Sequence, residues 1–415
     1  MQPKRVVITG VGLTSPIGDT FDEASESLQT GRHGIRAMPE WDRIGDLRTK
    51  LAGVSNLALK GRYPRKKIRS MGRVSLLATY ASEVAIADAG LAPELVSSGR
   101  VGLAYGSTTG SSDAMEEFCG TLFTNYSLRG LSANSYLKMM SHTCAANLAL
   151  FFGIRGRIIP TCSACTSGAQ AIGYAYESVK YGLQEVMIAG GAEEIHFASA
   201  ATFDLMFATS AGYNDRPDAS PRPFEEARDG LVIGEGAGTV ILESYERAVA
   251  RGARIYGELL GYGTNCDGLH VTAPSQVGMA GAMELSLADA GLSPDVIDYV
   301  NAHGTATEIG DIAESQATRK VFGRAVPISS TKSYTGHTLG ACGALEAIFS
   351  LAMMRDRFLA PTRNLEVIDP RCGELDYIRE RRDADPKIIM SNNFAFGGVN
   401  TSMILGALDP ATAAS

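Results

Sequence analysis

The chain has 415 residues, 45% hydrophobic and 20% charged, which is ordinary for a globular protein of two or three domains. Its net charge of −7 argues against nonspecific nucleic-acid binding as its main role. No apolar stretch is long enough to predict a membrane span. The seven cysteines are odd in number and scattered, which favours a reducing, cytoplasmic setting over a disulfide framework.

Short runs of β-branched and apolar residues alternate with longer helical patterns along the whole chain. The predicted strands are Val6–Val11, Val101–Tyr105, Glu185–Ala189, Thr239–Leu242, Ile297–Asn301, Ile328–Thr331 and Ile388–Ser391. The predicted helices are Ser75–Ala89, Thr166–Tyr181, Ala280–Ala290, Asp311–Phe322 and Ala341–Arg357. This alternation predicts an α/β architecture with buried sheets. The second and fifth of these helices are rich in Ala and Gly and should be buried on nearly all sides.

An internal repeat indicates a duplicated unit. The segment Glu83–Leu91 (EVAIADAGL) matches Glu284–Leu292 (ELSLADAGL), and each is followed by a Pro-acid pair, a strand and a Gly-containing loop. Chance similarity between Ala-rich helices is the alternative explanation. Duplication predicts one half over residues 1–250 and another over 251–411, with residues 412–415 as a tail.

The segment Thr161–Gly168 (TCSACTSG) carries a candidate nucleophile. It joins an apolar strand to a helix, so Cys165 faces free N–H groups and the helix dipole, which favour a thiolate. The same N–H groups can hold an oxyanion. Cys162 and Cys165 form a C-x-x-C, but no second pair completes a metal site, so we expect no metal. A buried, inert cysteine is the alternative for Cys165.

Three further loops follow predicted strand ends, as in many α/β active sites. One holds His303 with Thr305 and Thr307, whose hydroxyls can serve a polar ligand or cap the next helix. A second holds Lys332 and His337 among Gly, Ser and Thr. The third places Phe396, which can also be a core residue, before two glycines.

These groups fit a single reaction. A cysteine can take an acyl group as a thioester. Two neutral imidazoles can donate hydrogen bonds to a second thioester and stabilise the enolate that forms when a malonyl unit loses carbon dioxide. The carbanion then attacks the acyl group on Cys165. Lys332 adds a positive charge that can orient His337.

The loops resemble those of the elongating β-ketoacyl-acyl-carrier-protein synthases, which have the thiolase fold. The matching segments are Thr161–Gly168, Asn301–Asp311, Lys332–Gly343, Asn393–Asn400, Arg222–Gly230, Gly234–Gly238 and Val7–Gly12. The resemblance runs from residue 4 to about residue 407. It implies a five-layer αβαβα body of duplicated halves, and a homodimer or a heterodimer with a ketosynthase-like paralogue.

The resemblance also assigns roles to residues. Cys165 is the expected nucleophile, His303 and His337 the decarboxylation pair, and the N–H groups of Cys165 and Phe396 the oxyanion hole. Supporting roles are expected for Lys332, Glu346 and Asp311, and Phe396 matches the family's gating aromatic. The expected substrate-binding residues are Thr305, Thr307, Phe394, Gly397, Gly398, Phe207 and Thr108. No bound cofactor is implied, because a carrier protein delivers the phosphopantetheine arm.

The carrier proteins of this family are acidic, and the densest basic cluster here is a candidate docking patch. It comprises Arg65, Lys66, Lys67 and Arg69. An ordinary solvated surface is the alternative. Polar residues at 107–112 and the segment Phe207–Ser210 depart from the family's usual acyl-pocket pattern, which leaves open whether the substrates belong to fatty-acid or polyketide synthesis. A thiolase and a non-catalytic chain-length partner remain alternative functions.

Overall fold

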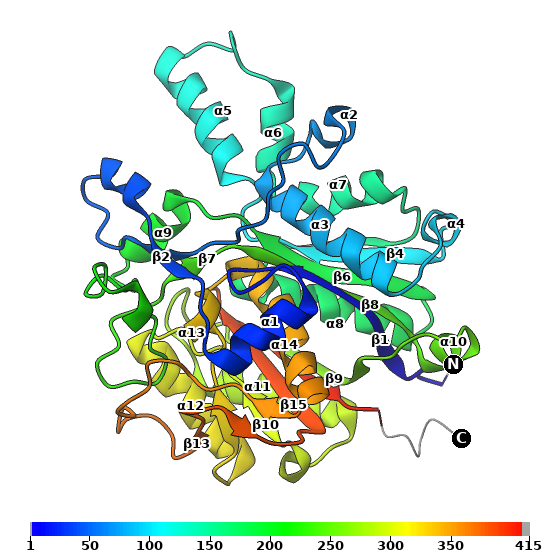
Figure 1. The fold of residues 1–415 in the computed structure, drawn as a ribbon, viewed down its shortest axis with the longest axis vertical. Helices are drawn as coiled ribbons and strands as arrows, with labels where there is room; N and C mark the ends of the chain where they lie inside the picture. The colour runs from blue at the N-terminus through cyan, green and yellow to red at the C-terminus, as the bar shows by residue number, and fades with distance from the viewer. Residues whose placement is uncertain (1, 409–415) are drawn as a thin grey trace.

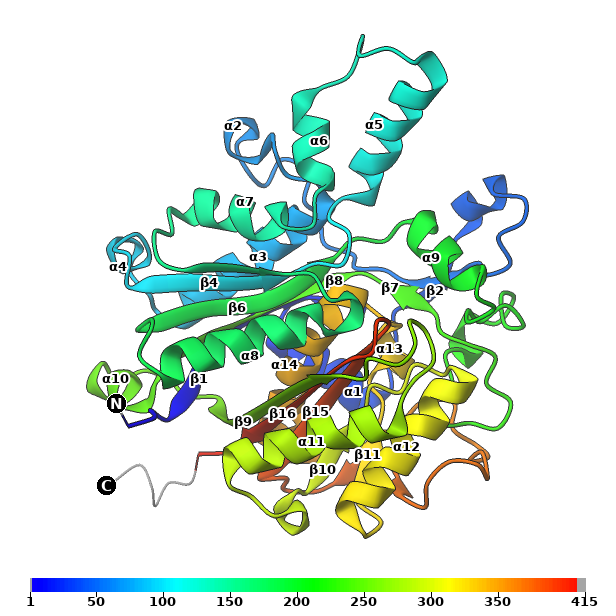
Figure 2. The same ribbon diagram turned by 180° about the vertical axis from the view of Figure 1, so that it is seen from behind.

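The protein is described by a computed structural model that covers residues 2–408 and has five layers (Figures 1 and 2). Two helices cover the outer face of one sheet, two lie between the sheets, and two cover the outer face of the other sheet. In that order the pairs are α3 (Arg73–Asp88) and α7 (Thr143–Phe152), α8 (Ser167–Lys180) and α14 (Cys342–Asp356), and α11 (Gln276–Ala290) and α12 (Glu308–Phe322). The predicted five-layer α/β fold is confirmed.

The two halves repeat one strand order. The first sheet runs β5 (Ile158–Thr161), β4 (Val101–Gly106), β6 (Val186–Glu193), β8 (Gly236–Ser244) and β1 (Val6–Thr14). The second runs β11 (Pro327–Ser329), β10 (Tyr299–Asn301), β15 (Ile388–Ala395), β16 (Val399–Gly406) and β9 (Gly257–Cys266). When the five strands of each half are numbered by their order along the chain, both sheets run third, second, fourth, fifth, first. In each sheet the fifth strand is antiparallel to its two neighbours. Pairing of β1 with β9 joins the sheets into one of 11 strands, with β13 (Asp376–Tyr377) at one edge.

Burial on both faces explains the composition of the central elements. All nine residues of β1 are buried, as are thirteen of the fifteen residues of α14. Small residues let the two middle helices approach closely: a Cβ on Gly343 of α14 would lie 2.7 Å from the Cβ of Ala169 on α8. The middle layer therefore packs the start of α8 against the start of α14, where the reactive loops meet.

The remaining elements connect the layers or surround them. The longer ones are α1 (Phe21–Thr30), α5 (Ser112–Asn125), α6 (Ala133–Met139), α9 (Phe197–Asp204) and α10 (Tyr245–Ala250). The short ones are β2 (Ile35–Ala37), η1 (Pro39–Arg43), β3 (Leu51–Gly53), α2 (Arg65–Ile68), α4 (Pro93–Val96), η2 (Ala164–Thr166), η3 (Pro217–Ala219), β7 (Ile233–Gly234), η4 (Pro294–Val296), α13 (Lys332–Thr335), η5 (Leu339–Ala341), β12 (Phe358–Leu359) and β14 (Arg382–Asp383). The pair α5–α6 projects from the body (Figure 1). Among the residues described, no helix combines the length and apolar character needed to cross a membrane.

Each predicted strand and helix is found, with ends shifted by a few residues. Elements that the sequence prediction missed include the strands β9 and β16, the layer helix α7 and the helical pair α5–α6. The strand β16 was hidden because Asn400, Thr401 and Ser402 in its first half are polar yet buried, with hydrogen bonds to their side chains. The predicted tail at residues 412–415 lies outside the described residues.

Candidate active site

The turn that carries Cys165 joins β5 to α8. Ala164 adopts a left-handed conformation with φ of 50°, which turns the next residue toward the middle of the molecule. Hydroxyl hydrogen bonds hold the turn: Thr161 Oγ1 donates to the carbonyl of Ser167 at 2.8 Å, and Ser167 Oγ accepts from the N–H of Ser163 at 2.9 Å. The short Ser and Thr side chains thus fix the thiol at the head of α8.

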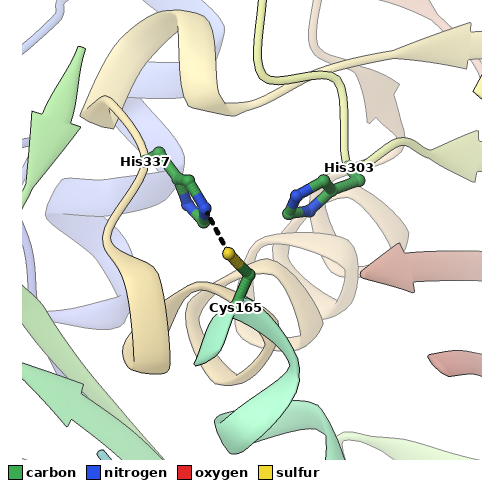
Figure 3. Close-up of side chains that lie close together, drawn as sticks. All are labelled: Cys165, His303 and His337. Atoms are coloured by element: carbon green, nitrogen blue, oxygen red, sulfur yellow. Dashed lines mark hydrogen bonds between the residues drawn. The ribbon is translucent and has the colours of Figure 1, made fainter. Parts of the chain in front are cut away.

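Two histidines from the second half meet this thiol (Figure 3). His303 follows β10, and His337 follows the short helix α13. Nε2 of His337 lies 2.9 Å from Sγ of Cys165, and one nitrogen of each ring and the sulfur all lie within 4.8 Å of one another. The two rings are nearly perpendicular, at 89°, with centroids 5.1 Å apart. All three side chains can therefore contact one small ligand.

Burial and one buried cation set the charge states of these groups. Desolvation lowers the pKa of both His303 and His337 well below its usual range, and the nearby Lys332 ammonium lowers it further. Both rings are therefore neutral near pH 7. Burial also raises the pKa of the Cys165 thiol to about 12, against the opposing effect of Lys332. The helix terminus alone was expected to favour a thiolate, but desolvation makes the resting group a thiol.

Lys332 is buried and paired. Its Nζ donates to Oε1 of Glu346, whose Oε2 accepts from Nδ2 of Asn393 at 2.6 Å. Because the ammonium contacts Glu346, it acts on the histidines through its field and not through a hydrogen bond that orients His337. Asn393 lies on β15 and was not singled out from the sequence. The pair places a fixed positive charge beside two neutral rings.

The cysteine and two histidines also match the donor set of a metal site, so their tautomers matter. Nδ1 of His337 accepts the N–H of Leu339 at 3.3 Å, which places the ring proton on Nε2, the atom that faces the sulfur. A protonated Nε2 donates a hydrogen bond and offers no lone pair to a metal. The arrangement therefore suits the binding of an oxygen or sulfur acceptor.

A cavity of about 390 Å³ leads to this group. Its lining includes the predicted residues Cys165, His303, His337, Thr305, Thr307, Asp311, Phe394, Phe396 and Gly398. The hydroxyls of Thr305 and Thr307 are 3.0 Å apart. Thr307 occupies the N-cap position of α12 without a side-chain capping bond, so its hydroxyl pairs with Thr305 instead. The two hydroxyls form a polar spot in an otherwise largely apolar passage.

The loop between β15 and β16 forms part of the cavity wall. Gly397 and Gly398 have φ of 89° and 71°, a conformation that side chains disfavour, so both positions suit glycine. The Phe396 ring packs against that of Phe203, with centroids 5.6 Å apart. The N–H of Gly397 donates to the carbonyl of Val271 at 2.7 Å, which fastens this loop to a second segment of the wall.

Some predicted residues lie outside the cavity lining. The Phe207 side chain is 77% exposed, under the guanidinium of Arg48, while Met206 and Ala208 on either side of it line the wall. Phe207 has φ of 55°, which turns its ring outward. Gly397 and Thr108 are likewise absent from the lining; Thr108 lies beside the Cys165 turn, where its carbonyl accepts the thiol of Cys162 at 3.1 Å.

The predicted basic cluster is exposed but apart from the cavity. Arg65, Lys66 and Lys67 form α2, and Arg69 follows it. In both views the pair α5–α6 lies between α2 and α9, and α9 contributes Phe203 to the cavity wall (Figures 1 and 2). The cluster therefore does not border the cavity of its own chain.

Two buried carboxyls support the His303 loop, and sequence reasoning found only one. Asp311 accepts the N–H groups of Phe224 at 2.8 Å and Ala306 at 3.1 Å. Glu314 accepts those of His303 and Gly304, each at 2.7 Å. The two acids lie three residues apart on one face of α12, and that spacing could have pointed to Glu314 once Asp311 was chosen.

The similarity of this chain to known proteins agrees with this geometry. The profile of the Beta-ketoacyl synthase N-terminal domain matches residues 3–248, and that of the C-terminal domain matches residues 256–366. The chain belongs to the β-ketoacyl synthase family. The family's 3-oxoacyl-[acyl-carrier-protein] synthase 1 of Haemophilus influenzae is 39% identical over 403 residues, which cover 97% of this chain and 98% of that protein.

Solved structures of the β-ketoacyl synthase family agree with this one over nearly its whole length. A crystal structure of a β-ketoacyl synthase from Burkholderia phymatum STM815 has a TM-score of 0.95 and 53% identity, covering 98% of this chain and 100% of that one. AntDE:AntF is described as a type II polyketide acyl-carrier protein in complex with its ketosynthase bound to the hexaketide. It has a TM-score of 0.90 and 31% identity, with 98% and 100% coverage.

Proposed function

We propose that this β-ketoacyl synthase is an elongating enzyme, which condenses a malonyl-carrier-protein thioester with an acyl group held on Cys165. The main support is the placement of one buried thiol and two neutral imidazoles within 4.8 Å of one another at the base of a cavity. These groups supply a nucleophile and two hydrogen-bond donors, which are the parts that the reaction requires.

In the first half-reaction, Cys165 Sγ attacks the thioester carbonyl of an acyl carrier protein. The N–H groups of Cys165 and Phe396 hold the oxyanion, and the carrier's phosphopantetheine sulfur leaves with the proton that the Cys165 thiol gives up. The products are an acyl-Cys165 thioester and a free carrier thiol. The hydrogen bond from His337 Nε2 to the sulfur at 2.9 Å stabilises the charge that develops on Sγ.

In the second half-reaction, a malonyl thioester occupies the cavity and its carbonyl oxygen accepts hydrogen bonds from His303 and His337. The malonyl carboxylate leaves as carbon dioxide, and its electron pair forms an enolate that the two neutral donors stabilise. The enolate carbon attacks the acyl carbonyl and the C–S bond to Cys165 breaks. The Cys165 thiolate that leaves takes a proton from water, which restores the resting thiol, and the product is a β-ketoacyl-carrier thioester.

The state of the second cysteine near the site argues against the thiolase alternative. Cys342 Sγ donates to the carbonyl of Cys165 at 3.2 Å, and burial raises the pKa of the Cys342 thiol well above its usual range. A thiol in that state is a poor base. The chain-length-partner alternative is less well supported because Cys165 is present and reaches the cavity.

The carrier protein supplies the only prosthetic group in this proposal, its phosphopantetheine arm. We place the arm along the hydroxyls of Thr305 and Thr307 and the loop from Phe394 to Gly398. The docking patch comprises Arg65, Lys66, Lys67 and Arg69. Among residues 2–408 these four side chains make no ion pair within 4.0 Å, so their charge is free to meet an acidic partner.

We further propose that the enzyme is a cytoplasmic dimer, with a second copy or a ketosynthase-like paralogue as the partner. The edge strand β5 leaves Ile158 43% exposed, and the projecting pair α5–α6 exposes Phe123, Leu128 and Tyr136. An exposed sheet edge beside apolar side chains favours pairing with another chain.

We also propose that each chain divides into its two halves near residue 250, between α10 and β9.

The proposed function is tested by incubating the protein with a panel of acyl-carrier thioesters and with malonyl-carrier protein. Intact mass should show an acyl adduct on the wild type, none on Cys165→Ala, and a product longer by one two-carbon keto unit. The panel also separates fatty-acid from polyketide substrates. A stable acyl adduct on Cys165→Ala, or no product with any carrier thioester, would reject the proposal.

A further inference from the structure

A buried glutamate behind the nucleophile connects two of the active-site loops. Glu193 is the last residue of β6 and is only 1% exposed. It does not line the cavity, so it is not expected to touch either substrate. It was not singled out from the sequence, because it lies at the end of a buried strand and precedes a second glutamate, with no motif around it.

A single oxygen makes both connections. Oε2 of Glu193 accepts the N–H of Thr108 at 2.9 Å and the N–H of Gly340 at 3.1 Å. Thr108 belongs to the loop after β4, and its carbonyl accepts the thiol of Cys162, three residues before the nucleophile. Gly340 lies three residues after His337. One atom therefore links the Cys165 turn and the His337 loop.

Gly340 is packed so tightly that no side chain fits at this position. A Cβ at Gly340 would lie 2.9 Å from Glu193 Oε2 and 2.9 Å from the nitrogen of Thr108, so only glycine fits between them. On its other side, the carbonyl oxygen of Gly340 lies 2.7 Å from where a Cβ on Gly168 of α8 would be. The Gly340 peptide is thus clamped between Glu193 and the start of α8.

The glutamate holds this place without a cationic partner. Within residues 2–408, Glu193 makes no ion pair within 4.0 Å, in contrast to Glu346 with Lys332 and Glu235 with Arg73. Burial raises the pKa of Glu193 to about 7, and the side chain and N–H of Thr108 and the N–H of Gly340 oppose that effect. A buried carboxyl without a cationic partner is costly to the fold, so its position calls for a specific use.

We propose that Glu193 is a positioning residue for the condensation, whose Oε2 fixes the distance between His337 and Cys165 by joining the Thr108 and Gly340 loops. This role rests on the proposed function. It requires an acceptor oxygen at one point in space, not a negative charge. Small displacements of a hydrogen-bond donor from the reacting atoms cost large factors in rate, so the link should affect kcat.

Three variants separate geometry from charge. Glu193→Gln keeps an amide oxygen that can accept from both N–H groups while the charge is lost. Glu193→Asp keeps the charge but withdraws the oxygen by about one C–C bond length. Glu193→Ala removes the acceptor. We expect malonyl decarboxylation to stay within about threefold of wild type for Gln and to fall at least about tenfold for Asp and Ala, with an unchanged KM.

The neighbouring Glu194 provides the matched control, since it is equally buried at 2% exposure. Its carboxylate accepts from Ser111 and from the N–H groups of Asp113 and Val74, which lie at the starts of α5 and α3. Glu194→Ala carries a similar folding cost but leaves the two active-site loops joined. We expect its kcat per folded molecule to stay within about threefold of wild type.

The outcomes distinguish this inference from the function on which it rests. A wild-type protein without decarboxylase and condensing activity would reject the proposed function. If the wild type is active and Glu193→Asp matches it in kcat, the positioning role is wrong. Loss in Glu193→Gln with retention in Glu193→Asp would also overturn it, because charge would then be the requirement. Glu193→Asp and Glu193→Gln keep the test decisive even if Glu193→Ala does not fold.

Discussion

Nε2 of His337 lies 2.9 Å from the sulfur of Cys165, and it carries the proton of the ring. The N–H of Leu339, donated to Nδ1, fixes that tautomer. His337 therefore approaches the thiol as a hydrogen-bond donor and not as a general base. The same donor can next serve the malonyl carbonyl, which links the acylation and decarboxylation steps through one fixed ring.

Malonyl decarboxylation by Cys165→Gln should be insensitive to pH between about pH 6 and 8. The substitution removes the nucleophile and leaves both imidazoles. Because burial and Lys332 lower the pKa of His303 and His337 well below the usual 6.5, both rings stay neutral as pH falls through that range and protonate only further down. The rate of carbon dioxide release across a pH series measures this. A loss with a midpoint near pH 6.5 would contradict the assignment.

His303→Ala and His337→Ala should each slow decarboxylation by about 100-fold, since loss of one preorganised oxyanion donor usually costs that much. The rate of carbon dioxide release from malonyl-carrier protein is the measurement. His142→Ala is the control, because His142 is exposed and precedes α7. Normal decarboxylation by both active-site variants would remove the imidazoles from the mechanism.

Lys332→Met should destabilise the fold by about 3–5 kcal/mol, because it leaves the Glu346 carboxylate buried without its partner. It should also raise the pKa of both histidines, since the ammonium now lowers it, and so move the acid limb of decarboxylation toward neutral pH. Thermal unfolding and a pH series measure the two effects.

Adding Glu346→Gln to Lys332→Met separates the loss of stability from the change in histidine pKa. The double variant removes the unpaired charge, so it should recover most of the lost stability. It does not restore the positive field, so its acid limb should stay shifted. A double variant as unstable as Lys332→Met would show that the ion pair is not the source of the loss.

The sequence predicted the reactive loops well because each motif is local. A strand end, a small-residue turn and a helix start can be read within about ten residues, and the duplicated pattern indicated that two such sets would face each other. The close approach of Cys165 and His337 follows from that symmetry. The residues that support them were harder to find. Glu314 and Asn393 act through backbone or side-chain contacts that only the packed structure reveals.

Two outward-facing features show why local reasoning was insufficient. Phe207 stands between two cavity-lining residues, yet its left-handed backbone turns the ring to solvent, and no neighbouring glycine or proline marks that conformation in the sequence. The basic cluster at residues 65–69 is dense in sequence, but its distance from the cavity depends on how α2 packs against α7, where Lys67 Nζ lies 5.0 Å from the centroid of the Phe151 ring. Surface placement of this kind is set by tertiary packing.

Lys66→Glu and Arg69→Glu should each weaken binding of the acyl carrier protein, by roughly threefold to tenfold at low salt. Both side chains are exposed on or beside α2, so long-range attraction to an acidic partner is their main contribution, and salt should screen it. Titration of carrier protein at two ionic strengths measures the effect, and Lys320→Glu, at the exposed end of α12, is the charge-matched control. The helix α2 lies apart from the cavity of its own chain. The two substitutions should therefore lower both carrier affinity and turnover only if the docked carrier spans α2 and a cavity. Equal weakening by Lys320→Glu would mean that net charge, and not this patch, attracts the carrier.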